Sequence, residues 1–187
     1  MDFQDNGRGL MVPNHKIIMG GRFRVEHRRL IKTDVFDHPI WDTLDVEEID
    51  NLVVNQGLNH ILGVEFNGQT QITNWFLGLF QGNYSPVASD TAATLPGNAT
   101  ECSSFTSPTR PAWQEAAPSG QSITNSANPA IFTFNAPVTV YGAFLTSSST
   151  IGGTSGTLFA AAQFASPKAV ANADQLLVSY TFNAASA

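Results

Sequence analysis

The clearest pattern in the chain is an alternation of hydrophobic and polar residues near its C-terminus. From Leu176 to Phe182 every second side chain is hydrophobic, as in a strand with one buried face. Residues 131–134, 138–145 and 158–164 form similar runs, separated by turn residues that include Asn, Pro, Ser and Gly. These four runs predict four consecutive strands.

The middle of the chain carries weaker signals of the same kind. Residues 75–80 form a continuous hydrophobic run that is too short for a free-standing helix, which predicts a buried strand. Shorter strands are expected near residues 100–106, 112–116 and 121–124, between Pro-rich turns. About eight strands with such spacing predict a mainly β fold, an antiparallel β-sandwich with a jelly-roll-like body.

One α-helix is predicted before these strands, at residues 46–62. Asp45 and Glu48 resemble a capping box, and hydrophobic residues from Val46 to Ile61 recur near one helical face. Gly63 would end the helix, and Gly57 inside it indicates close packing against another element.

The first 44 residues predict an extended N-terminal arm, followed by a body at residues 45–187. Residues 1–15 are polar and predict an extended tail. The pair Gly20-Gly21 lies between two short runs and predicts the turn of a hairpin at residues 16–28. Residues 33–44 are acidic without regular periodicity and predict a strap over a surface.

Length and composition narrow the class of protein. A chain of 187 residues with 42% hydrophobic residues is expected to form one core. Only 13% of the residues are charged, against about 25% in typical soluble domains. A surface so poor in charge favours association, so a homo-oligomer is expected.

The net charge of −6 is unevenly distributed along the chain. Residues 1–32 contain seven basic and three acidic side chains, whereas residues 33–50 contain seven acidic and no basic ones. Everything after residue 50 contributes two basic and five acidic side chains. Charge is therefore concentrated in the first quarter of the chain.

The basic segment 22–32 is the main candidate for a binding site. Its arginines could bind an acidic protein surface, a nucleic acid backbone or the chain's own acidic residues 33–50. Because the body is not basic, a protein partner or the chain itself is favoured over nucleic acid. The predicted partner-contact residues are Arg22, Phe23, Arg24, Val25, Arg28, Arg29, Phe36 and Trp41.

The sequence predicts no catalytic, cofactor or metal site. Residues 152–156 are Gly-rich but lack the Lys of a phosphate-binding loop, so a hairpin loop is expected there. The four histidines lack zinc-site spacing, and none follows His60 to act as a base for a nucleophile. Paired carboxylates for a hydrolase are scarce, and enzymatic activity is the least favoured of three hypotheses.

The N-terminus and the single cysteine indicate the compartment. Cys102 is alone, so it cannot form an internal disulfide. The chain has neither an apolar N-terminal run of signal-peptide length nor a stretch of about 20 apolar residues that could cross a membrane. Synthesis in a cytosol and no membrane association are expected.

Several strings of residues resemble head decoration or cement proteins of tailed bacteriophages. The resemblance covers roughly residues 50–183. It lies in packing and turn residues, namely Asn51–Leu62, Trp75–Leu79, Asp90–Thr91, Thr109–Trp113, Phe144–Ser147, Gly153–Leu158 and Leu177–Thr181.

The resemblance implies a non-enzymatic structural protein of the virion, located on the capsid surface and made in the host cytoplasm. It implies a jelly-roll-like body with an N-terminal arm that reaches over the major capsid protein, over copies of itself, or over both. An alternative is a tail or fibre module that assembles with tail proteins or whose sandwich binds a host-surface glycan. In that case Trp75 and Trp113 would be exposed platforms for sugar rings.

Overall fold

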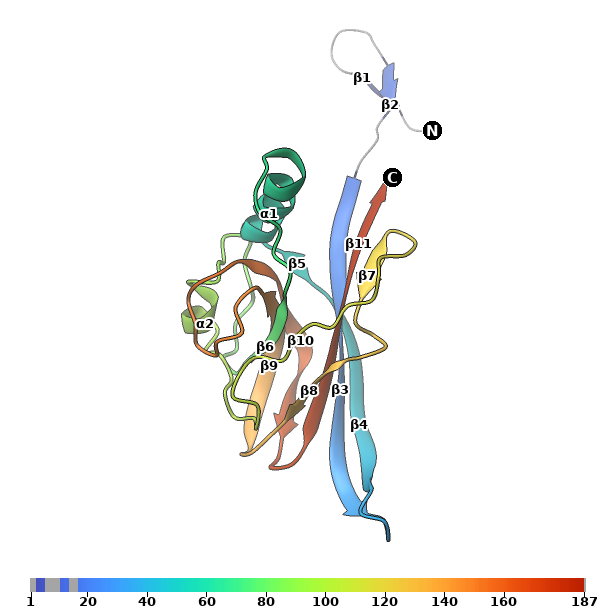
Figure 1. Ribbon diagram of the computed structural model, residues 1–187, viewed down its shortest axis with the longest axis vertical. Coiled ribbons are helices and arrows are strands. Elements are labelled where there is room, and N and C mark those ends of the chain that lie inside the picture. Colours follow the sequence, from blue (N-terminus) through green and yellow to red (C-terminus); the bar gives the residue numbers. More distant parts are fainter. Residues whose placement is uncertain (1–2, 6–10, 14–16, 187) are drawn as a thin grey trace.

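Two antiparallel sheets, packed face to face, form the body of the protein (Figure 1). The computed structural model describes residues 3–5, 11–13 and 17–186. The chain is mainly β, with 48% strand and 9% helix, which confirms the predicted β-sandwich with one main helix.

The larger sheet has the order β4-β3-β11-β7, and β8 also pairs with β11. Its strands are β3 (Ile17–Thr33), β4 (Pro39–Asp50), β7 (Ser122–Thr124), β8 (Ala130–Thr133) and β11 (Gln175–Ser186). The four-stranded sheet has the order β5-β10-β9-β6. Its strands are β5 (Leu52–Val53), β6 (Phe76–Phe80), β9 (Val138–Thr146) and β10 (Leu158–Val170).

The remaining elements are short. Strands β1 (Phe3–Asp5) and β2 (Met11–Pro13) pair with each other. The helices are α1 (Asn55–Phe66) and α2 (Leu95–Asn98), and α1 lies near the upper end of the molecule in Figure 1. The expected extended tail at residues 1–15 falls largely outside the described residues.

The core lies between the two sheets. The larger sheet contributes Phe23, Val178 and Tyr180, and the smaller sheet contributes Leu79 and Leu145, all of them buried. Successive side chains of a strand point to opposite faces, so the smaller sheet also has an outer apolar face. There Phe80 and Phe144 pack with Leu95 of α2 in a second buried cluster.

Most of the predicted strands are confirmed. The four C-terminal runs correspond to β8, β9, β10 and β11, residues 75–80 correspond to β6, and residues 121–124 correspond to β7. The strands expected near residues 100–106 and 112–116 were wrong, since these stretches form only isolated bridges such as Phe105↔Phe134. Pro108 and Pro111 lack the backbone N–H that a continuous ladder requires.

The predicted start of the helix was wrong. Residues 46–50 belong to β4, and the helix covers Asn55–Phe66 rather than residues 46–62. The backbone of β4 pairs with that of β3, from Asp50↔Arg22 to Pro39↔Thr33. The interstrand hydrogen bonds of this ladder outweigh the local helical pattern of residues 46–50. The inferred close packing at Gly57 is confirmed, because a Cβ atom there would lie 2.4 Å from the Phe159 carbonyl oxygen.

The predicted hairpin at residues 16–28 was also wrong. Strand β3 runs straight through Gly20-Gly21, and the chain reverses instead at residues 34–38, between β3 and β4. Gly20 and Gly21 pair with Asn183 and Phe182 of β11, which keeps them extended. Residues 17–33 are therefore part of the larger sheet rather than of a separate arm, and the expected acidic strap includes the turn and the start of β4.

Gly21 is required by a close approach and not by a turn. A Cβ atom at this position would lie 2.4 Å from the Tyr180 hydroxyl and 2.6 Å from the Thr181 carbonyl oxygen. At Gly20 the same atom would meet nothing within 4 Å. The two neighbouring glycines thus differ completely in what they tolerate.

We expect Gly21→Ala to lower the free energy of unfolding by about 1–3 kcal/mol, the usual cost of overpacking a filled site. Gly20→Ala is the matched control and should leave the stability nearly unchanged. Chemical denaturation followed by fluorescence measures both. Equal stabilities of the two variants would contradict the close approach at Gly21.

Candidate functional site

The β3–β4 hairpin projects beyond the rest of the body (Figure 1). Pairing of β3 with β11 ends at Arg28↔Gln175, whereas pairing with β4 continues to Thr33↔Pro39. We call residues 29–44 the projecting end. Six of its apolar side chains are exposed, namely Leu30, Ile31, Val35, Phe36, Ile40 and Leu44. Six exposed apolar side chains on one projecting hairpin are typical of a binding surface.

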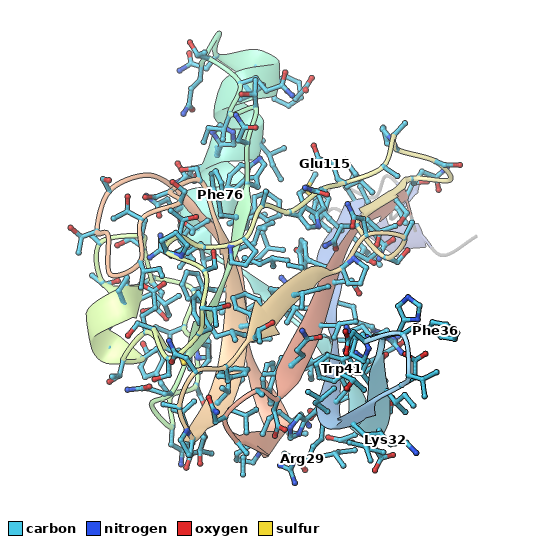
Figure 2. All side chains as sticks on the ribbon, turned by 60° about the horizontal axis from the view of Figure 1, so that its bottom comes forward. Arg29, Lys32, Phe36, Trp41, Phe76 and Glu115 are labelled. Atoms are coloured by element: carbon cyan, nitrogen blue, oxygen red, sulfur yellow. The ribbon has the colours of Figure 1, made fainter. Side chains whose placement is uncertain are left out.

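The turn at the projecting end is held in one conformation by Asp34. Its carboxylate accepts hydrogen bonds from the backbone N–H groups of His38 (2.9 Å) and Phe36 (2.8 Å). These bonds lower the pKa of Asp34 below its ordinary value. Val35 and Phe36 within this turn are 92% and 76% exposed. The turn is therefore ordered while its apolar side chains point into solvent, as Figure 2 shows for Phe36.

A buried carboxylate at the turn between β10 and β11 fixes the base of the hairpin. Asp174 is 1% exposed and accepts two hydrogen bonds from Arg29, at 2.9 and 2.7 Å. It also lies 3.0 Å from Nε2 of His27 and accepts the N–H of Ala171 at 2.8 Å. Burial by itself would raise the pKa of Asp174, but these hydrogen bonds outweigh it and hold the pKa well below 3.8.

A buried lysine ties β4 to the smaller sheet. Lys168 of β10 is 3% exposed and donates hydrogen bonds to the carboxylates of Asp45 and Glu47. Burial lowers the pKa of Lys168, but the two carboxylates more than compensate and raise it above its ordinary value. Glu47 also accepts the N–H of Ala165, at 2.6 Å. Asp45, which resembled part of a helix cap, and Glu47 therefore join the two sheets.

The predicted contact residues do not form one surface. Phe23 and Val25 are fully buried in the core, so they are not available to a partner in this conformation. Arg22 and Arg24 lie on the opposite, outer face of β3. Arg22 binds Glu48 and Asp50 of β4, so the alternative that the basic segment binds the chain's own acidic residues 33–50 holds for Arg22. Arg24 instead binds Glu26.

The other four predicted residues lie at or near the projecting end. Arg28 donates to Gln175 and lies over the ring of Trp41, 4.6 Å from its centre. Arg29 is held by Asp174, and Phe36 is exposed at the turn. Figure 2 shows Arg29, Lys32, Phe36 and Trp41 together in this part of the hairpin.

The sequence interpretation missed the aliphatic residues of this surface, which are Leu30, Ile31, Val35, Ile40 and Leu44. A signal was present, since Val35 lies between acidic residues in a stretch without strand or helix periodicity. A segment without strand or helix periodicity does not direct its apolar side chains to one buried face, so exposure of Val35 was to be expected.

The few charged residues of the body are mostly structural. Arg110 is buried and donates to both carboxylate oxygens of Glu101, at 2.7 Å each. Arg110 also donates to the carbonyl oxygen of Ser148, and Glu101 accepts the N–H of Gly152. The Gly-rich stretch is thus a loop between β9 and β10, as predicted, shaped by one buried ion pair.

The two tryptophans that the glycan-binding alternative would need as exposed platforms have different surroundings. Trp113 is 7% exposed, and its indole N–H donates to the Tyr180 carbonyl oxygen at 3.1 Å, so it is a core residue and does not serve as such a platform. Trp75 is half-buried and lines an apolar pocket of about 430 Å³ beside α1, together with Ile61, Phe159 and Phe182.

A second hollow, of about 640 Å³, lies on the outer face of the larger sheet, beside Arg22. In the described residues no helix is long and apolar enough to cross a membrane. Nor does that part of the chain bring three His, Cys, Asp or Glu side chains together in a way that could hold a metal ion.

No protein-family model matches the chain, and no curated protein is significantly similar to it in sequence.

We expect Asp174→Asn to lower the free energy of unfolding at pH 7 by about 3 kcal/mol, the low end of the cost of breaking a buried ion pair. The low end applies because Arg29 is half exposed and water can solvate it. Asp37→Asn is the control, since Asp37 is exposed and has φ 62°, which Asn adopts readily. Equal losses in the two variants would contradict the role of Asp174.

The contribution of Asp174 should also depend on pH. Its pKa is lowered in the folded state, so its contribution is complete above the ordinary carboxyl pKa of 3.8 and is lost as the pH falls below that value. Denaturation from pH 7 to pH 2.5 should therefore show a steeper acid decline for the native sequence than for Asp174→Asn. Parallel declines would argue against this prediction.

Proposed function

We propose that the protein is a non-enzymatic structural protein of a bacteriophage virion, a head decoration or cement protein that binds the capsid through the projecting end of β3–β4. The observation that carries this proposal is the ordered turn that holds Val35 and Phe36 in solvent. An apolar group presented in a fixed conformation loses little entropy on binding, which is the property of a docking element. The resemblance of residues 50–183 to decoration proteins supports the same role.

The partners proposed are the major capsid protein, copies of this chain, or both. Strand β4 has a partner strand only on the β3 side within the described sheet, so its other edge can pair with a strand of a neighbour. The acidic residues along β4 disfavour pairing of two β4 edges with each other. The open edge therefore favours a different element of the neighbour, beside a contact made by the apolar side chains of the projecting end.

A structural role is also supported by how the charged side chains are used. Arg110 and Glu101 bind each other, Asp174 binds Arg29, and Lys168 binds β4. Each of these groups is engaged in holding a loop or strand in place. Charged side chains that are engaged in this way hold the fold in shape rather than act on a substrate.

The proposal is tested with the double variant V35D/F36D. Both side chains are exposed, so the fold should be unaffected, while binding to purified capsids that lack the protein should weaken at least tenfold in co-sedimentation. The loss follows from placing two charges in an interface centre that favours aromatic residues. Val87→Asp, which alters another exposed apolar side chain, is the control and should bind normally. Undiminished binding of V35D/F36D would refute the proposal.

A further inference from the structure

The outer face of the larger sheet contains an open groove of about 640 Å³. The strand register places Arg24, Arg22 and Gly20 of β3 opposite Ser179, Thr181 and Asn183 of β11. These side chains share one face of the sheet, since Phe23 and Val25 between them point into the core. Glu48 and Asp50 of β4 line one side of the groove.

The groove is hollow because its floor consists of small residues. Gly20 has no side chain, and a Cβ atom there would meet nothing within 4 Å. Ser179 and Ala185 provide the neighbouring floor on β11. A molecule lying along the strands could thus approach the sheet closely.

The charged groups of the groove are held in place by one another. Arg22 donates to Asp50 at 2.9 Å and to Glu48 at 3.1 Å, and all three side chains remain more than half exposed. Arg24 is held by Glu26 in the same manner. Fixed guanidinium and carboxylate groups in a row present strong donors and strong acceptors side by side.

The sum of these charges indicates the class of ligand. Among the lining residues the two arginines are balanced by Glu48 and Asp50, so the groove attracts neither an anion nor a cation. The exposed amide of Asn183 adds a group that both donates and accepts hydrogen bonds, beside Thr181, whose hydroxyl lies 2.7 Å from that of Thr124. Such a mixture fits a neutral ligand that is rich in hydroxyl groups, because each hydroxyl also donates and accepts.

We infer that this groove binds a neutral polysaccharide. Adjacent sugar hydroxyls would donate to Glu48 or Asp50 and accept from Arg22, while Asn183 binds a neighbouring unit. The lining residues follow β3 from Ile18 to Arg24 and β11 from Ser179 to Ala185, so the groove suits an extended segment of a chain. This activity is separate from the proposed capsid contact, which lies at the projecting end of the hairpin.

The test is a glycan array that carries neutral and acidic oligosaccharides, probed with the full chain and followed by calorimetric titration of the bound neutral glycan. Gly20→Phe fills the groove at a position where an added Cβ atom meets nothing within 4 Å, and should weaken binding at least tenfold. Asn183→Ala removes one exposed amide and should weaken binding about three- to tenfold. Gly97→Phe, at an exposed glycine where an added Cβ atom also meets nothing within 4 Å, is the control and should bind normally.

Retention of a neutral glycan that is lost in Gly20→Phe and weakened in Asn183→Ala would support the inference. Three results would overturn it: no neutral glycan bound by the native chain, binding of acidic glycans alone, or full binding by both groove variants. Asn183→Ala keeps the test decisive if Gly20→Phe fails to fold. Capsid binding by Asn183→Ala should be unchanged, which separates this result from the proposed function.

Discussion

The arrangement of the whole molecule depends on the antiparallel pairing of β3 with β11. This ladder runs from Ile17↔Ser186 to Arg28↔Gln175 and joins the two ends of the continuously described stretch 17–186 in one sheet. It places Phe23 and Val25 in the core and Arg22 and Arg24 on the outer face. It also ends before β3 does, and for that reason the rest of the hairpin projects from the body (Figure 1). Core, groove and projecting end are consequences of one register.

Buried ion pairs then fix the parts of the β3–β4 hairpin that do not pair with β11. The two buried groups bind opposite strands of the hairpin. Asp174 binds Arg29 on β3, and Lys168 binds Asp45 and Glu47 on β4. Buried pairs rarely stabilise a fold more than well-packed apolar groups would, but removal of one partner is costly. In a chain with only 13% charged residues, these pairs hold both strands of the hairpin against the body.

The fold could be predicted from sequence wherever the pattern is local. The hydrophobic alternation in residues 176–182 and the runs before it identified β8 to β11, because a half-buried strand requires period two. Gly57 was correctly interpreted as a close contact, although the helix around it was placed too early. Errors arose where a distant partner decided between two local options. Gly20-Gly21 suits a turn, and residues 46–50 suit a first helical turn, until each finds strand partners.

The amino-acid sequence was enough to predict the mainly β class, the C-terminal strands, the concentration of charge near the N-terminus and the scarcity of charge in the body. These are properties of composition and of short-range periodicity, which need no partner. Three features follow only from the assembled sheet: β3 pairs with the acidic strand β4, Phe23 and Val25 lie in the core, and Val35 and Phe36 are exposed. The pairing of β3 with β4 and the exposed turn between them follow from the reversal of the chain at residues 34–38. The face on which Phe23 and Val25 lie depends on the strand register, and that register is set by β11, more than a hundred positions away.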